Sequence, residues 1–180
     1  MMGSALKYIP HYTYDDWLHW EGRWELINGI PIAMSPMPVP EHQRVAGELH
    51  TELNIAIRKS RCKNCSVYQP IDYKIAEDTI FEPNILIACG KINRSYLDFA
   101  PSLIVEIVSK STEERDRGIK YDYYEQQGVK YYIIVDWRKK TIEIYRLMDG
   151  RYQLQSWERN FEFQLNENCK ISPELENIWE

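Results

Sequence analysis

The stretch Leu103–Lys120, which reads LIVEIVSKSTEERDRGIK, decides the fold of this chain. It begins with a run of aliphatic residues that is typical of a β-strand buried on both faces. One carboxylate, Glu106, lies inside that run. Because a charged side chain in such a strand is costly without a cation or hydrogen-bond donors, we expect another segment to supply Glu106 with a partner.

A helix is expected directly after this strand. Ser111 followed by Glu114 matches the capping-box pattern of a helix start, and the predicted helix continues to about Gln127. Gly128 then supplies the stop, because glycine readily adopts the left-handed conformation that ends many helices. The sequence therefore predicts a strand, a polar turn and a single helix in succession.

The predicted helix carries candidate partners for Glu106. Asp116, Lys120 and Tyr124 follow one another at steps of four residues, so they share one helix face. The strand can then offer a carboxylate, and the helix a carboxylate and an ammonium group, to one location. The alternative is that Glu106 faces solvent and that Asp116 and Lys120 form an ordinary surface ion pair.

Length and composition indicate a globular protein. The chain has 180 residues, of which 44% are hydrophobic and 27% charged, and we expect one domain over residues 1–180 with a core at about 13–147. We find no membrane-spanning run and no signal-peptide pattern, so the expected location is the cytoplasm. The formal net charge of -5 gives no general attraction to nucleic acid, so DNA binding would have to rest on local patches.

The four cysteines give a weak signal. Cys62 and Cys65 form a C-x-x-C pair, but Cys89 and Cys169 do not form a second pair at the spacing of a zinc site. In a cytoplasmic protein we expect these thiols to be reduced.

Before the central stretch, the clearest signals are a hairpin and a long helix. Asn28-Gly29, between apolar segments at 24–27 and 30–34, is a strong two-residue hairpin signal. Pro40 suits the first position of a helix that runs to about Lys59, and His42 lies near the start of its apolar stripe. The stripe consists of Val45, Leu49, Leu53 and Ile57.

The remaining segments complete an α/β pattern. Further strands are expected at 67–75 with a bend at Pro70, and at 81–88, 131–135, 141–147 and 152–157, with a short helix at 173–179. We therefore expect a mixed β-sheet flanked by helices, with an N-terminal hairpin and C-terminal antiparallel strands.

Four phrases in this order form a recognisable pattern. They are WELINGIPIAMSP at 24–36, EPN at 82–84, SLIVEIVSKST at 102–112 and DRGIKYDYYEQQGVKYYIIVD at 116–136. Over roughly residues 13–146 the chain resembles the Uma-type restriction endonucleases, a branch of the PD-(D/E)XK nuclease superfamily. The resemblance implies a restriction-endonuclease-like fold and a DNA endonuclease that depends on Mg²⁺, with Mn²⁺ as a second possible ion.

The resemblance also implies roles for particular residues. In that superfamily an Asp and a Glu hold the metal and a Lys assists the attacking water. Glu106 matches the metal-binding Glu, and Asn84 stands where the family has its Asp. Val108 occupies the third position of a contiguous E-x-K motif, so Lys120 of the following helix becomes the candidate lysine.

Further polar residues match the family pattern or compensate for Asn84. Glu25 and His42 match polar positions of the family, and Asp116 either orients Lys120 or is a surface charge. For His42, a packed, hydrogen-bonded histidine is the alternative to an acid or base. An amide oxygen at Asn84 brings no charge, so Glu82, on the same strand face, or Glu25 would have to compensate as a metal ligand.

Two main hypotheses of function remain open from the sequence. The first is a metal-dependent endonuclease, expected as a homodimer because two copies of one site most simply cut both strands of a duplex. The second is a catalytically silent nuclease-fold module that binds DNA or a partner subunit, which the loss of charge at Asn84 favours. An interaction protein of no catalytic descent is a third alternative.

Overall fold

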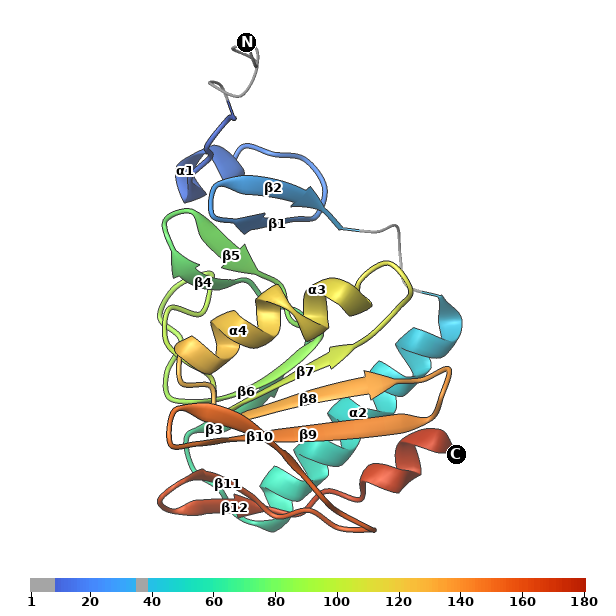
Figure 1. The fold of residues 1–180 in the computed structure, drawn as a ribbon. Helices are drawn as coiled ribbons and strands as arrows, with labels where there is room; N and C mark the ends of the chain where they lie inside the picture. The colour runs from blue at the N-terminus through green and yellow to red at the C-terminus, as the bar shows by residue number, and fades with distance from the viewer. Residues whose placement is uncertain (1–8, 35–38) are drawn as a thin grey trace.

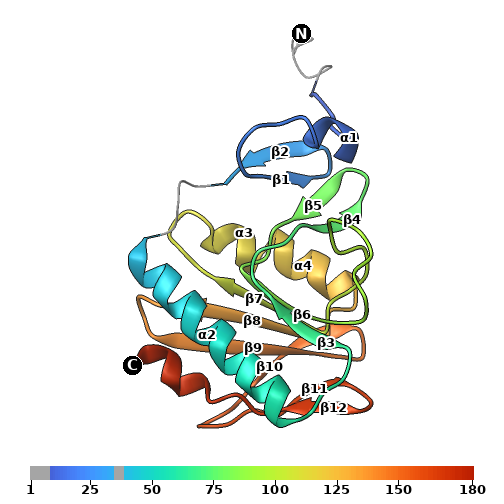
Figure 2. The same ribbon diagram turned by 180° about the vertical axis from the view of Figure 1, so that it is seen from behind.

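Two β-sheets organise the computed structural model, which describes residues 9–34 and 39–180. The larger sheet has the strand order β10-β9-β8-β7-β6-β3, and the smaller has the order β2-β1-β5-β4. Helices α3 and α4 cover one face of the larger sheet, whereas α2 crosses the opposite face (Figures 1 and 2). The expected α/β fold with helices on both faces of a mixed sheet is confirmed.

The centre of the larger sheet is the predicted buried strand and its neighbour. β7 (Leu103–Ile107) runs parallel to β8 (Tyr131–Asp136), and every residue of both strands is buried. The other pairings in this sheet are antiparallel. The outer strands are β3 (Cys65–Tyr68), β6 (Ile85–Cys89), β9 (Thr141–Met148) and β10 (Arg151–Gln155).

Alternation along β7 separates two cores. Leu103, Val105 and Ile107 pack in the core on the α2 side, whereas Ile104 belongs to the core that includes α4. Because successive side chains of a strand point to opposite faces, Glu106 faces the same side as Ile104. α2 (Pro40–Lys59) buries the expected apolar stripe against the first core.

The helix predicted over 111–127 is interrupted. The structure has α3 (Glu113–Arg117) and α4 (Ile119–Gln126) instead, separated at Gly118. A Cβ atom at Gly118 would lie 2.9 Å from the carbonyl oxygen of Glu114, so this break requires glycine. The expected start at Ser111 is also wrong, because the residue preceding the first helical position is Thr112, whose Oγ1 accepts a hydrogen bond from the Ser109 N–H at 3.1 Å.

The smaller sheet contains the predicted hairpin, β1 (Trp24–Ile27) and β2 (Ile30–Ala33). Asn28 and Gly29 have φ values of 49° and 73°, the conformation that such two-residue turns need. β4 (Tyr73–Ala76) and β5 (Thr79–Phe81) complete this sheet. The single bent strand expected at 67–75 and the strand expected at 81–88 are each divided between the two sheets, so these two predictions were wrong.

Short elements complete the two ends of the described chain. They are α1 (Tyr14–Trp17), β11 (Phe163–Asn166), β12 (Cys169–Ile171) and the 3₁₀ helix η2 (Leu175–Trp179). The β11–β12 hairpin was not predicted from the sequence, whereas the short helix near the C-terminus was. Across the described residues, no helix has the length and apolar character needed to cross a membrane.

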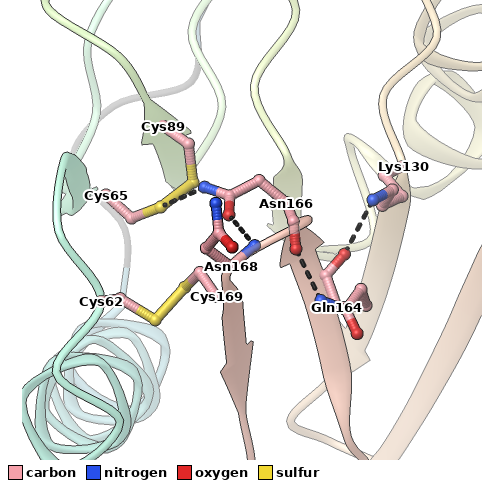
Figure 3. Close-up of a disulfide and its surroundings, with 8 residues drawn as sticks. All are labelled: Cys62, Cys65, Cys89, Lys130, Gln164, Asn166, Asn168 and Cys169. Carbon is pink, nitrogen blue, oxygen red and sulfur yellow. Dashed lines mark hydrogen bonds between the residues drawn. A yellow bond between two sulfur atoms is a disulfide. The ribbon is translucent and has the colours of Figure 1, made fainter.

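The four cysteines form two disulfides, so the expectation of reduced thiols is wrong (Figure 3). Cys62, just after α2, is bonded to Cys169 in β12, and Cys65 in β3 is bonded to Cys89 in β6. The C-x-x-C pair therefore does not act as a unit. Its partners are 107 and 24 residues away in sequence, and the fold alone brings them together.

We expect the long-range disulfide to contribute strongly to stability. Replacing Cys169 with Ser opens the link that closes the 107-residue separation, which should lower the free energy of unfolding by about 2–5 kcal/mol. Urea unfolding of the parent and of Cys169→Ser measures this difference. Cys89→Ser is the control with a shorter loop and a smaller expected loss. Free thiols titrated in the unfolded parent before any reductant is added would contradict both bonds.

Candidate active site

Glu106 has the partners that its buried position demands. The residue is 2% exposed, and its Oε1 accepts hydrogen bonds from Lys120 Nζ at 2.9 Å and from Tyr124 Oη at 3.1 Å. Both donors come from α4, which lies across the face of β7 on which Glu106 stands. The strand carboxylate and the helix ammonium therefore meet in the interior. The alternative, in which both face solvent, is not observed.

Lys120 lies among three carboxylates. Its Nζ is 2.7 Å from Glu25 Oε1, 2.9 Å from Glu106 Oε1 and 3.5 Å from Asp116 Oδ1. All four side chains are buried, and the carboxylates come from β1, β7 and α3. We call these four residues the buried charge cluster.

Local contacts fix the acidic members of this cluster. Glu25 Oε1 also accepts a hydrogen bond from the Glu82 N–H at 3.1 Å, which ties β1 to the segment after β5. The carbonyl oxygen of Asp116 accepts a hydrogen bond from Tyr132 Oη of β8 at 2.8 Å. Asp116 therefore keeps its expected i,i+4 relation to Lys120 across the break between α3 and α4.

The ionisation of the cluster follows from burial and mutual charge. Burial raises the pKa of Glu106, an effect that Lys120 opposes and that Asp116 and Glu25 reinforce. Burial likewise raises the pKa of Asp116. For Lys120, burial lowers the pKa, but the three carboxylates outweigh burial and hold that pKa above its ordinary value. Lys120 is therefore a permanent cation at neutral pH.

Asn84 and His42 both bind the backbone of Ile107, the residue after Glu106. Asn84 Oδ1 accepts a hydrogen bond from the Ile107 N–H at 2.7 Å. His42 Nε2 lies 3.0 Å from the Ile107 carbonyl oxygen, so Nε2 must carry the hydrogen that is donated. Burial lowers the pKa of His42, which favours the neutral ring.

The buried charge cluster opens on a cleft of about 440 Å³, within the range of small-molecule sites. Sequence reasoning missed several of its cations. Arg23, Lys110, Arg115 and Arg138 line this cleft. The charged run at 113–117 contains Arg115, whose Nε lies 3.6 Å from Glu25 Oε2, so part of this run faces the cleft. The cleft wall therefore carries cations as well as the four carboxylates of Glu25, Glu82, Glu106 and Asp116, although the protein is acidic as a whole.

Glu82 lines the same cleft, but its carboxylate is paired with the guanidinium of Arg23. The structure therefore places all six candidate catalytic residues, and Glu82, around one cleft. It does not bring Glu82 and Asn84 into the cluster around Lys120. The sequence predicted seven residues of the cleft wall: Glu25, His42, Glu82, Asn84, Glu106, Asp116 and Lys120.

The carboxylate and amide oxygens in the cleft wall are chemically suited to a hard divalent cation. Carboxylate and amide oxygens are the ligands that Mg²⁺ prefers. Within residues 9–34 and 39–180, Glu25 Oε2 and Asp116 Oδ1 are buried without a hydrogen-bond partner. The same part of the chain holds no ready-made group of three His, Cys, Asp or Glu side chains around a metal position. The ammonium of Lys120 instead lies between the carboxylates.

Comparison with known families agrees with this arrangement. Residues 12–179 match the model of the Uma2 family, which is described as "Putative restriction endonuclease". The chain belongs to the Uma2 family. The expected membership is therefore confirmed over nearly the whole sequence.

A solved structure supports the fold of this Uma2 protein. It is described as "a putative nuclease belonging to DUF820" from Anabaena variabilis, and it superimposes with a TM-score of 0.72 at 16% identity. The alignment covers 93% of this chain and 97% of that protein. At this identity the likeness shows the fold alone. No curated protein matches the sequence.

Lys120→Met should strongly destabilise this Uma2 protein. The change leaves buried carboxylates without their shared cation, so we expect a loss of about 3–5 kcal/mol at pH 8. A carboxyl group with a raised folded-state pKa binds its proton more tightly in the folded state, so the deficit should shrink as the pH falls towards about 4. Urea unfolding at several pH values measures both effects.

Lys170→Met is the matched control for this experiment. Lys170 forms an exposed pair with Glu162, so its replacement should change the free energy of unfolding by less than about 1 kcal/mol. A Lys120→Met loss as small as that of the control, or a loss independent of pH, would contradict the electrostatic account of the cluster.

Proposed function

We propose that this Uma2 protein is a divalent-metal-dependent endonuclease that hydrolyses phosphodiester bonds in DNA. The observation that carries the proposal is the buried Glu106–Lys120 pair at a cleft with further cationic side chains in its wall. Membership in a family described as restriction endonucleases supports the reaction class. Restriction-endonuclease-like families generally use divalent metal ions, which supports the dependence on metal.

The cleft cations suit a phosphate backbone. Arg115 and Lys110 lie in the cleft wall, and arginine can bind phosphate oxygens through two parallel hydrogen bonds. Because the net charge of the protein is -5, attraction to DNA would be local to this cleft. DNA is therefore the proposed partner, and its binding should weaken as salt concentration rises.

Glu106 and the side-chain oxygen of Asn84 would hold the ion, and Glu82 is a third candidate ligand whose carboxylate is now paired with Arg23. Mg²⁺, or Mn²⁺ in its place, would neutralise charge on the scissile phosphate and lower the pKa of a coordinated water. Asn84 Oδ1 already accepts one hydrogen bond, and a carbonyl oxygen has a second lone pair for a ligand.

Lys120 acts in this proposal as a fixed positive charge. The three carboxylates keep its pKa above the ordinary value, which favours the ammonium form and suits an electrostatic role. From the floor of the cleft it would donate hydrogen bonds to the attacking water and stabilise negative charge that develops at the phosphate. Glu25 and Asp116 hold it in place, and His42 holds the β7 backbone beside Glu106.

Glu106→Gln should abolish metal-dependent cleavage. The substitution keeps the shape of the side chain but removes the negative charge that would hold the ion. Cleavage of supercoiled plasmid in Mg²⁺ or Mn²⁺ measures activity, and calorimetry measures metal uptake. Glu41→Gln, on the exposed side of α2, is the control and should cleave as the parent does. Equal cleavage by the parent and Glu106→Gln would exclude Glu106 from the metal site.

Asn84→Asp should raise cleavage. An Asp side chain can still accept the Ile107 N–H, and it adds a second anionic ligand beside Glu106. We expect metal affinity and cleavage rate to rise by at least roughly tenfold, the lower end of what outer ligand partners contribute. Asn168→Asp, on the exposed β11–β12 turn, adds the same charge away from the cleft and should have no effect. Unchanged activity of Asn84→Asp would place Asn84 outside the metal site.

Asn84 also favours the second function, a nuclease-fold module without catalysis. Its amide lacks the charge of the family Asp, and the structure gives its oxygen a backbone role next to Glu106. The two functions differ in metal uptake. Salt-sensitive DNA binding without any heat of Mg²⁺ binding would identify the silent module, whereas metal uptake that Glu106→Gln abolishes would identify the endonuclease.

The proposal includes a homodimer that acts in the cytoplasm. Two copies of one cleft would cut both strands of a duplex, and sedimentation of the protein with DNA tests that assembly. A DNA endonuclease must act where DNA is held. Disulfides are rare in reducing compartments, so trapping the thiols in intact cells tests whether both bonds persist at that location.

A further inference from the structure

A second, smaller pocket adjoins the catalytic cleft. Its volume is about 180 Å³, and it shares Arg23, His42 and Asn84 with the cleft wall. α2 contributes its other wall through Gln43 and Gly47. A ligand in the cleft could therefore extend into this side pocket past His42 and Asn84.

The side pocket is lined by polar groups that the protein does not use internally. In the described part of the chain, His42 is 8% exposed, and its Nδ1 is buried without a hydrogen-bond partner. Because Nε2 donates to Ile107, Nδ1 of the neutral ring is an acceptor. Asn84 Oδ1 accepts a hydrogen bond from the Ile107 N–H, and Asn84 Nδ2 remains as a donor. Gln43 and Gln69 add two amide groups to the rim.

Gly47 lies in the wall of the side pocket without a structural need for glycine at that position. It lies in the interior of α2, where glycine is less favourable than alanine by about 1 kcal/mol. A Cβ atom at Gly47 would meet no protein atom within 4 Å, and its backbone is not in the left-handed conformation. Packing and backbone geometry therefore do not require glycine here. The missing side chain instead keeps the wall of the side pocket open.

Size and charge define the class of ligand. An engineered cavity of about 150 Å³ binds benzene, so this pocket matches one six-membered ring and not a whole nucleotide. A phosphate group is unsuited, because Arg23, the cation in this wall, is paired with Glu82. Apolar walls from Ala46, Pro70 and Ile85 suit the faces of a ring, and the polar groups suit its hydrogen-bonding edge.

We propose that the side pocket binds a pyrimidine base of the substrate DNA, next to the phosphate in the cleft. This inference rests on the proposed function, because it takes DNA as the occupant of the cleft. A base can enter such a recess only after it leaves the duplex stack. The substrate is therefore DNA that is single-stranded or locally unpaired at the cleavage point.

Metal-free binding tests this proposal without any need for cleavage. The probes are fluorescein-labelled nine-nucleotide single strands of thymidine, of deoxyadenosine and of abasic residues, in EDTA. All three carry the same backbone charge, so a difference between them reports the bases. For the parent we expect the thymidine strand to bind about tenfold more tightly than the abasic strand, as one stacked and hydrogen-bonded base can provide. The deoxyadenosine strand should resemble the abasic one.

Gly47→Ala should remove the preference for the thymidine strand and leave the fold intact. The added methyl group fills part of the pocket wall, whereas the helix gains stability, so the melting temperature should rise or stay unchanged. Ile55→Ala is the matched control, two turns further along α2, exposed, uncharged and outside the side pocket, with a gain in helix propensity as well. It should keep the parent's preference for thymidine.

The outcomes separate this proposal from the proposed function. Equal binding of thymidine and abasic strands by the parent, including no binding of either, overturns the base pocket, as does a preference for deoxyadenosine. A thymidine preference that Gly47→Ala retains also overturns it. Failure of the nuclease proposal is read separately, from equal plasmid cleavage by the parent and Glu106→Gln in Mg²⁺.

Discussion

One buried ammonium group holds the two sheets and the candidate site in their relative positions. Lys120 binds Glu25 from the smaller sheet and Glu106 from the larger one, and Asp116 precedes it by one helical turn. A buried carboxylate without such a cation would be costly, so each of these contacts depends on the others. The same ion pairs therefore stabilise the packing of the smaller sheet and set the charge at the floor of the cleft.

Side-chain hydrogen bonds also fix the backbone of β7 beside Glu106. Pairing between β6 and β7 ends at Ile85 and Val105, so the Ile107 N–H lies beyond the ladder. Asn84 supplies the missing acceptor, and His42 donates to the Ile107 carbonyl. An amide oxygen serves this structural role as well as a carboxylate would. Asn84 thus keeps the geometry of the strand end without the negative charge that an aspartate would bring there.

The charges of this acidic Uma2 protein are unevenly distributed around the cleft. The carboxylates of the cluster are buried and share the ammonium of Lys120, and Arg115 and Lys110 lie in the same cleft wall. Net charge describes the whole molecule, and it does not describe the potential inside a cleft. Any attraction of this protein to a phosphate backbone would therefore depend on the exposed cations of the cleft wall.

The sequence by itself determined the elements whose signals are local. The apolar run around Glu106, the Asn28-Gly29 turn and the stripe of α2 follow from periodicity and turn chemistry, and the i,i+4 spacing of Asp116 and Lys120 placed those two side chains together. Glu25 and His42 came from family resemblance, because nothing in their own segments indicates a shared cleft.

Only the tertiary structure decided the features that depend on distant segments. These are the division of residues 67–88 between two sheets, the arginines of the cleft and both disulfides. Periodicity reports which face of an element is buried, but not which other element covers it. Contacts across tens of residues arise when the sheets and helices pack, so no local pattern can encode them.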